Sequence, residues 1–200
     1  AMASPSTLCR LENRITRKTL VRLSALFVQQ FLDSHDTPPD EITLDFDATD
    51  DRVHGAQQER FFHGYYKSYC FLPLYVFCGD QLLCAYLRPS KNDGAKHARA
   101  ITKLLVAAIR ERWPDVKITI RGDSGFCRWR LMRWCDHHGV SYIFGLARNK
   151  ILERQIAGLL QQAEGAFEAT RGEKQRLFGE TLYAANSWDR QRRVIMKAER

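Results

Sequence analysis

Two short segments carry acids at positions from which they could do chemistry. The first, ITLDFDATDD at residues 42–51, holds four acids in ten positions, although the chain has a formal net charge of +8. Apolar and polar residues alternate along it, so Asp45 and Asp47 share the face opposite the apolar residues of a predicted strand. The second, ITIRGDSGF, places Asp123 after another alternating run, 76 residues beyond Asp47. Asp47 and Asp123 therefore each end a predicted strand.

If these two strands are parallel neighbours, Asp47 and Asp123 meet at their carboxyl ends, where open α/β sheets place their sites. Two carboxylates about 4 Å apart repel by roughly 4 kcal/mol at an effective dielectric near 20, and a cation between them removes that cost. Oxygen ligands without a His or Cys set favour Mg²⁺ or Mn²⁺. Two such ions can activate the attacking oxygen and stabilise the leaving oxygen of a phosphodiester.

The alternative for any strand-end aspartate is a turn former or a helix N-cap. We favour that interpretation for Asp50 and Asp51. Asp45 shares a face with Asp47 but lies deeper, so we expect it to be hydrogen-bonded rather than to bind metal directly.

The balance of charge indicates a polyanionic partner. Lys and Arg number 31 against 23 acids, and the pI is about 9.3. Nucleic acid is the first candidate for such a partner, and a charge that serves only solubility is the alternative. No apolar run reaches the length of a membrane span, and the N-terminal residues lack the apolar core of a signal peptide. We therefore expect a cytoplasmic protein with no membrane partner.

The six cysteines contain no C-x-x-C pair. Without a secretory signal, we expect reduced thiols that act as small core residues. A zinc site is the alternative, although its spacing fits no common structural zinc site; its ligands would be Cys127, Cys135, His137 and His138.

The hydrophobic periodicity predicts helices and strands in a defined order. Helices are expected over 7–34, 94–112, 124–138 and 149–163. Strands are expected over 41–48, 69–78, 81–88, 116–121 and 141–147, with an irregular excursion over 49–68 and a hairpin turn at Gly79-Asp80. Beyond 167 only short strand-like runs follow, at 177–178, 181–184 and 193–197. This order predicts an α/β fold with a mixed sheet and flanking helices, in the strand order of RNase H.

We divide the chain accordingly into three parts. Residues 1–40 form an N-terminal helix and linker. Residues 41–165 form a partial RNase H-like core. Residues 166–200 begin a β-rich insertion.

Several motifs together resemble a known family. They are LDFDATDDRVHGAQ, FFHGYYKSYCFLPLYVF, LRPSKNDGAKHA, IRGDSGF and YIFGLARN. In this order they resemble a DDE-type transposase of a bacterial insertion sequence, and in particular the group 1 DDE transposase domain. The resemblance runs from about Ser6 to the end of the chain. DAT or GDSGF alone would be weak, but their combination is specific.

The resemblance implies an RNase H-like catalytic core in which two aspartates and a glutamate bind two divalent ions. Its first acid lies in a D-x-T motif, matched here by Asp47, and its second in a D-x-G-F motif, matched by Asp123. It implies nicking of DNA by water, followed by attack of the freed 3′-hydroxyl on another strand. The implied partners are double-stranded DNA at insertion-sequence terminal repeats and further copies of the chain. The implied location is the bacterial cytoplasm, at the nucleoid.

The third acid of such transposases lies on a helix after the last core strand, and after the insertion where there is one. Glu164 and Glu168 flank Gly165 in a stretch that reads as polar, and Glu199 is near the end with no expected partner. We therefore expect the third acid beyond Arg200, and little or no activity from this chain alone. The predicted transposition belongs to the full-length parent.

Basic and aromatic residues around these motifs are candidates for DNA contact. The cations assigned to DNA phosphates are Arg121, Arg128, Arg130, Arg148 and Lys150, with a solvated face as the alternative. Tyr65 and Tyr66 could stack on an unpaired base, although a buried aromatic pair is the commoner fate. Two other functions stay open: an RNase H-like nuclease without strand transfer, and a non-catalytic DNA-binding or inhibitory fragment.

Overall fold

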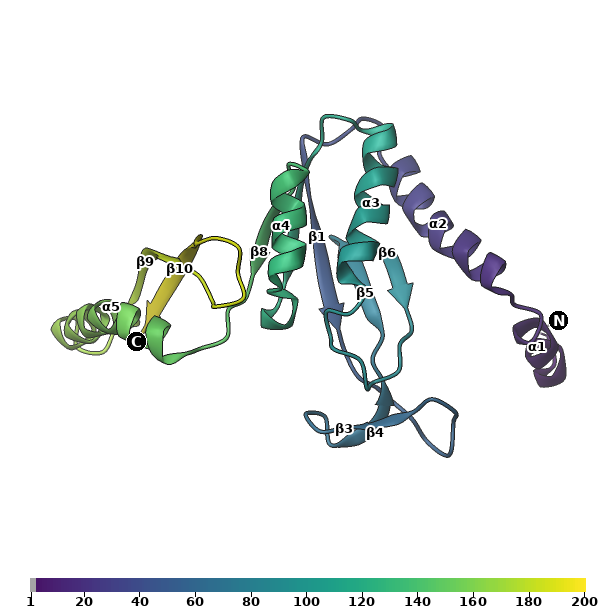
Figure 1. The fold of residues 1–200 in the computed structure, drawn as a ribbon, viewed down its shortest axis with the longest axis horizontal. Helices are drawn as coiled ribbons and strands as arrows, with labels where there is room; N and C mark the ends of the chain where they lie inside the picture. Colours follow the sequence, from purple (N-terminus) through teal and green to yellow (C-terminus); the bar gives the residue numbers. More distant parts are fainter. Residues whose placement is uncertain (1–2) are drawn as a thin grey trace. The chain divides into compact units, whose positions relative to one another are not determined.

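A computed structural model describes residues 3–200 of the chain (Figure 1). Its contacts divide the chain into two compact units, Ala1–Gly145 and Leu146–Arg200. The helix over residues 150–169 belongs to the second unit.

The first unit is built on a five-stranded mixed sheet with the strand order β6-β5-β1-β7-β8. Its strands are β1 (Glu41–Ala48), β5 (Leu74–Cys78), β6 (Gln81–Tyr86), β7 (Lys117–Gly122) and β8 (Ser141–Phe144). The β1–β7 and β7–β8 pairs are parallel, whereas β1–β5 and β5–β6 are antiparallel. The predicted mixed α/β architecture is confirmed at this level.

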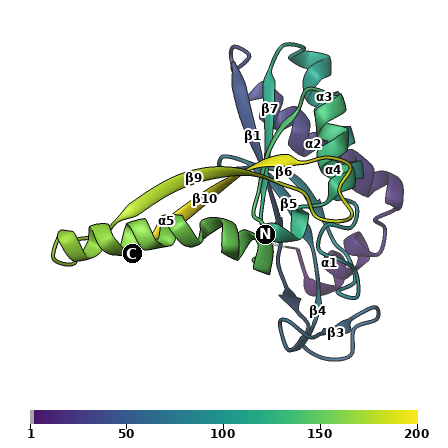
Figure 2. The same cartoon turned by 60° about the vertical axis from the view of Figure 1, so that its left-hand side comes forward.

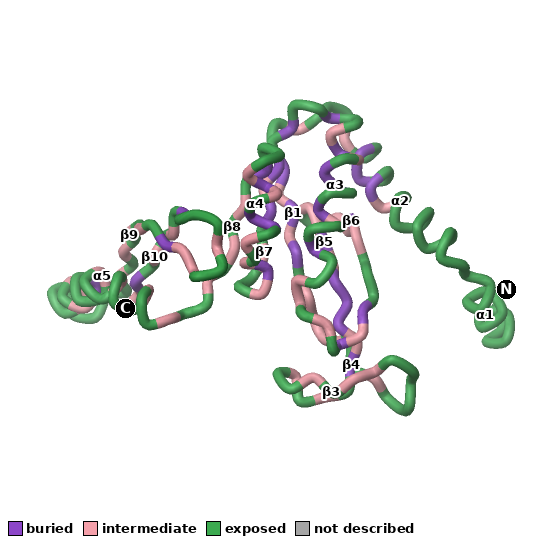
Figure 3. The backbone as a smooth tube through the Cα atoms, in the orientation of Figure 1, coloured by how far each residue is buried: buried purple, intermediate pink, exposed green. Residues whose placement is uncertain are grey.

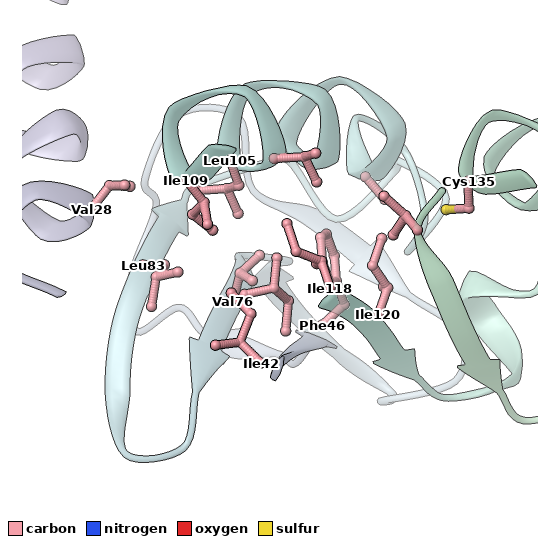
Figure 4. Packing of buried hydrophobic residues seen from close by; sticks show 14 of the residues in the cluster. Val28, Ile42, Phe46, Val76, Leu83, Leu105, Ile109, Ile118, Ile120 and Cys135 are labelled. Carbon is pink, nitrogen blue, oxygen red and sulfur yellow. The ribbon is translucent and has the colours of Figure 1, made fainter. Parts of the chain in front are cut away.

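The alternation that predicted the strands also builds the core. Along β1, the buried residues are Ile42, Leu44 and Phe46, and the residues between them are half-buried or exposed. Helix α3 (Ala98–Arg112) buries Leu105, Val106 and Ile109 in the same cluster, as does α4 (Trp129–His137) with Leu131 and Cys135. Figure 4 shows Leu105 and Ile109 of α3 facing side chains of the sheet such as Phe46 and Val76. The acids of β1 point to the opposite face.

The expected N-terminal helix is two helices. They are α1 (Pro5–Glu12) and α2 (Arg17–Asp33). Thr16 ends the break between them, because its hydroxyl accepts a hydrogen bond from the Thr19 amide and the Thr19 hydroxyl accepts one from the Thr16 amide. Such a reciprocal cap starts a helix regardless of the apolar periodicity on either side. Helix α1 buries no residue (Figure 3).

The excursion over 49–68 contains a small sheet of its own, with the order β2-β4-β3. Its strands are β2 (Asp51–Arg52), β3 (Phe61–His63) and β4 (Ser68–Phe71). The single strand expected over 69–78 is therefore two strands, β4 and β5, separated at Leu72-Pro73. Proline has no amide hydrogen for a strand ladder, which explains the break. The Gly79-Asp80 hairpin turn is confirmed, because Cys78 pairs with Gln81.

The helix expected over 124–138 also divides, into the short 3-10 helix η1 (Ser124–Phe126) and α4. Phe126 is 1% exposed and packs edge to face on Phe46, with 5.9 Å between ring centroids. This anchor turns the chain immediately after Asp123. Helix α3 begins at Ala98, four residues later than expected.

The second unit consists of helix α5 and a hairpin. Helix α5 (Lys150–Ala169) extends beyond the expected 163, and Asn149 caps its start by accepting from the Ile151 and Leu152 amides. The hairpin pairs β9 (Arg176–Tyr183) with β10 (Arg192–Glu199), so two expected short runs merge into β9. Figure 2 shows α5 running along this hairpin. No helix within residues 3–200 is both long and apolar enough to cross a membrane.

Candidate active site

The register of two parallel strands brings Asp47 and Asp123 to adjacent positions. Asp45 is paired with Arg121, and Phe46 with Gly122. Asp47 is the next residue on β1, and Asp123 comes directly after β7, so both lie at the carboxyl ends of these strands. Both are exposed. The juxtaposition expected from the sequence is therefore present in the backbone.

Neither Asp47 nor Asp123 has an ion-pair partner among residues 3–200. The Asp123 carboxylate accepts one hydrogen bond, from the Gly125 amide at 2.7 Å, which makes it the N-cap of η1. Acids close by are compensated instead. The pairs are Asp45–Arg121, Asp50–Arg52 at 3.2 Å and Asp93–Arg128 at 2.7 Å. Two carboxylates thus stay without a cation at one strand end of a basic chain.

Glycines make the turn around Asp123 possible. A Cβ atom on Gly145 would lie 2.8 Å from the Ser124 amide nitrogen, and one on Gly122 would lie 2.9 Å from the Phe126 ring. A Cβ on Gly125 would come within 2.9 Å of the Asp123 carboxylate. Real Cβ atoms do not approach so closely, so G-D-S-G-F is a packing requirement of the turn that holds the second acid.

Tyr66 reaches this strand end from the small sheet. Its hydroxyl donates to the Ala48 carbonyl at 3.3 Å, one residue beyond Asp47. Burial raises the pKa of Tyr66, and the negative charges of Asp50, Asp47 and Asp123 raise it further. The phenol therefore stays protonated and acts as a donor beside the two acids. No spacing in the sequence signals this contact, because it closes a loop of 18 residues.

Arg121 is bound by Asp45 rather than by Asp123. The guanidinium donates to both carboxylate oxygens, with Nη2 2.7 Å from Oδ2. The two residues lie opposite each other in the β1–β7 register, on the same face as the strand-end acids. Asp45 is thus hydrogen-bonded. Its pair with Arg121 joins the two strands two residues before Asp47 and Asp123.

The other predicted DNA contacts lie on different elements. Arg128 precedes α4 and pairs with Asp93, while the Arg130 guanidinium lies 5.3 Å from the centroid of the Trp129 ring. Arg148 and Lys150 are exposed and belong to the second compact unit.

The three glutamates weighed as third acids are placed differently from our expectation. Glu164 and Glu168 lie on helix α5, not in a polar loop, and Glu164 forms an ion pair with Arg200. Glu199, which we expected to be unsupported, lies on β10 and contacts three cations: Lys174, Lys197 and Arg176. These contacts, with Lys174 and Lys197 the strongest, lower the pKa of Glu199 to about 2.

Within residues 3–200, no group of three or more His, Cys, Asp or Glu is arranged to hold an ion. No such cluster is therefore formed by the four residues of the zinc alternative, which are Cys127, Cys135, His137 and His138. Cys135 is fully buried, and His138 stacks on Trp134 with 4.2 Å between ring centroids. At the strand ends, two carboxylates supply hard oxygen donors of the kind that Mg²⁺ and Mn²⁺ prefer.

Comparison with known protein families identifies the family to which this chain belongs. A family model described as "Transposase DDE domain group 1" matches residues 1–200. The chain therefore belongs to this family of DDE transposase domains, as the motifs indicated. Transposases of this class generally use divalent metal ions and act as nucleases and strand transferases.

Among solved structures, the chain is similar to a piggyBac transposase in a synaptic complex with hairpin DNA, determined by cryo-electron microscopy. The identity is 15% and the TM-score 0.44, and the match covers 98% of this chain and 40% of that one. A search of curated proteins finds no match.

Proposed function

We propose that this chain is a catalytic-core segment of a DNA transposase, in which Asp47 and Asp123 hold catalytic Mg²⁺ or Mn²⁺. The observation that carries the proposal is the pair of strand-end carboxylates left without a cation in a chain of net charge +8. A cation between the two carboxylates would relieve their repulsion, and a metal would supply it together with the chemistry.

The strand order supports an RNase H-like core. In chain order, the sheet reads third, second, first, fourth and fifth strand, and only the second strand is antiparallel to its two neighbours. The first and fourth strands carry the two acids at their ends. The division into residues 1–40, 41–165 and 166–200 is part of this proposal.

The residues of this chain have separate tasks in the proposed mechanism. Two divalent ions would stabilise the charge that develops on the phosphodiester oxygens, as Lewis acids. Asp47 and Asp123 would hold them. The Gly125 amide would fix the position of the Asp123 carboxylate, and the Asp45–Arg121 pair would keep the two strands in register.

Double-stranded DNA is the proposed substrate, at the terminal repeats of a bacterial insertion sequence and with several copies of the chain assembled on it. The excess of cations supports this partner. Arg130, Arg148 and Lys150 are the most direct candidates for phosphate contact. A third acid would have to come from another part of the protein than these two strand ends. Glu164 and Glu199 are poor candidates, because cations already pair with both.

Mn²⁺ binding tests the proposal directly. The chain and its Asp47→Asn and Asp123→Asn variants are titrated with Mn²⁺ and followed by electron paramagnetic resonance. Losing one of two carboxylate ligands is expected to weaken binding roughly 100-fold. Asp51→Asn is the matched control, because Asp51 is an exposed strand acid of the same segment, and its affinity should match that of the wild type. Equal affinities in all four proteins would contradict the proposal.

DNA cleavage by the full-length parent then separates transposition from general nuclease activity. End-labelled DNA that carries the terminal inverted repeat is incubated with Mn²⁺. Cuts at the repeat end support transposition, and cuts at random positions support a nuclease of the same fold.

A further inference from the structure

The small sheet β2-β4-β3 presents an aromatic face to solvent. Phe62 and Tyr69 are opposite each other in the register and lie on the same face, with 5.6 Å between their ring centroids. They are 58% and 49% exposed, and Tyr65 in the following turn is 84% exposed. The Arg60 guanidinium lies 4.7 Å from the centroid of the Tyr69 ring. Tyr65 contacts Tyr66, with 5.0 Å between ring centroids, rather than Phe62 or Tyr69. We call Arg60, Phe62 and Tyr69 the aromatic face.

The opposite face of the small sheet is already occupied. Cys70 is fully buried there. The Ser90 hydroxyl donates to the Phe61 carbonyl at 2.8 Å, and the Lys91 ammonium lies 4.4 Å from the centroid of the Phe61 ring. Phe71 also forms a bridge with Pro89. The segment after β6 therefore packs against the opposite face of the small sheet. The aromatic face is not the face that this segment covers.

The small sheet lies next to the candidate active site. Strand β2 begins at Asp51, just after β1 ends at Ala48. The Tyr66 hydroxyl ties the β3–β4 turn to the Ala48 carbonyl. Figure 1 shows β3 and β4 beyond the carboxyl end of the β1 arrow. A strand whose phosphate lies at Asp47 and Asp123 would carry its flanking nucleotides towards this sheet.

We propose that the aromatic face binds unpaired bases of a DNA strand, by stacking on Phe62 and Tyr69. Every base has a π-face, so exposed rings beside a cation such as Arg60 bind single strands with little sequence preference. Arg60 adds a cation that can stack or meet a phosphate. This inference rests on the proposed function, because the DNA strand held at Asp47 and Asp123 is the one whose bases would reach the aromatic face.

Charge complementarity favours nucleic acid over a protein partner. The chain carries an excess of cations, and Arg60 and the exposed Lys67 accompany the rings. An apolar protein interface would exclude such cations from its centre, whereas a phosphate backbone attracts them.

The test compares single-stranded and duplex DNA. The wild-type chain and the Phe62→Ala/Tyr69→Ala variant are titrated against labelled oligo(dT) of about 12 nucleotides and against a duplex of equal length. Removing two stacking rings is expected to weaken oligo(dT) binding by about tenfold or more, with duplex affinity changed less than about twofold and the salt dependence of binding unchanged. Absence of oligo(dT) binding by the wild type, or equal losses on both DNAs, would overturn the proposal.

Two further variants exclude trivial causes. Phe62→Leu/Tyr69→Leu keeps apolar bulk without an aromatic ring, so it should lose oligo(dT) affinity while the melting temperature stays at the wild-type value. Phe178→Ala removes a phenylalanine of similar exposure, 62%, from the second compact unit, and it should bind oligo(dT) like the wild type. If the Leu variant binds normally, or if the ring variants lose only self-association, the face binds protein and the proposal is wrong.

The proposed function can fail without this inference failing. Asp47→Asn should weaken Mn²⁺ binding roughly 100-fold and leave metal-free oligo(dT) affinity within about twofold, since stacking needs no metal. The aromatic variants should show the reverse pattern. Separate losses therefore identify which of the two proposals is wrong.

Discussion

The acids of β1 and β7 and the acid of β10 are treated in opposite ways by the same chain. Asp47 and Asp123 lie at adjacent strand ends, and no cation of residues 3–200 pairs with either of them. Glu199 lies on an exposed hairpin and contacts Lys174, Lys197 and Arg176. Two adjacent carboxylates without a cation repel each other, and the metal ion proposed above would remove that cost at the strand ends. Glu199 needs no such ion, because three cations of the chain contact it.

The two regions also differ in what supports them. Strand β1 has buried residues at every second position, whereas most of β9 is half-buried or exposed. We expect Leu44→Ala to lower the free energy of unfolding by about 2–5 kcal/mol, because Leu44 is fully buried beside the site. The matched Leu182→Ala change, at a residue 61% exposed on β9, should cost less than about 0.5 kcal/mol. Urea denaturation measures both, and similar losses would mean that the two strands are equally supported.

Glycine-to-alanine changes should have opposite effects on stability in the two regions. Gly145→Ala places a Cβ against the Ser124 backbone, so it should destabilise the chain by about 1–3 kcal/mol and weaken Mn²⁺ binding by displacing the turn at Asp123. Gly158→Ala, in α5 with open space around it, should stabilise by about 0.5–1 kcal/mol, because alanine favours helix. Thermal unfolding and Mn²⁺ titration measure these effects. A stable Gly145→Ala variant with normal Mn²⁺ affinity would show that the turn does not hold the acid in place.

Removing the cation of the Asp45–Arg121 pair should make the strand ends more attractive to metal. In Arg121→Gln, Asp45 becomes a third uncompensated carboxylate on the face that carries Asp47 and Asp123. We expect Mn²⁺ affinity to rise about three- to tenfold, through added negative charge at close range. Arg193→Gln, which frees Glu180 on the hairpin, is the control and should leave Mn²⁺ affinity unchanged. A fall in affinity in Arg121→Gln would mean that register, rather than charge, dominates the role of this pair.

The smallest effect is expected at Glu199. Its pKa is lowered to about 2 by Lys174, Lys197 and Arg176, so its pairing stabilises the folded state above the ordinary glutamate value of about 4.5 and is lost as the pH falls towards 2. Carbon-detected NMR titration should place the midpoint near 2, and Glu199→Gln should flatten this part of the acid stability profile. A midpoint near 4.5 would show that the cations do not hold the carboxylate in solution.

Much of the site could be predicted because its signals are local. Strict alternation over 41–48 gave the bounds of β1, and the G-D-S-G-F turn marked Asp123. Features that depend on distant partners could not be predicted. Tyr66 reaches Ala48 through a fold of the small sheet, and Glu199 gathers cations from β9 and from the preceding loop. The elements that divide in two lie between these cases. Pro73 is a recognisable signal for a break in a strand, whereas the helical periodicity on both sides of Thr16 gave no sign of the reciprocal Thr16–Thr19 cap.

The parallel pairing of β1 with β7 also has a consequence for when the proposed metal site can form. Asp47 and Asp123 are 76 residues apart in the sequence, and parallel strands of such separation form only after a large loss of chain entropy. The proposed metal binding at the strand ends should therefore appear late in refolding, after the β5–β6 hairpin, whose ends are neighbours in sequence. During synthesis, the nascent chain would carry Asp47 before Asp123 has been made, so this metal site could not yet exist.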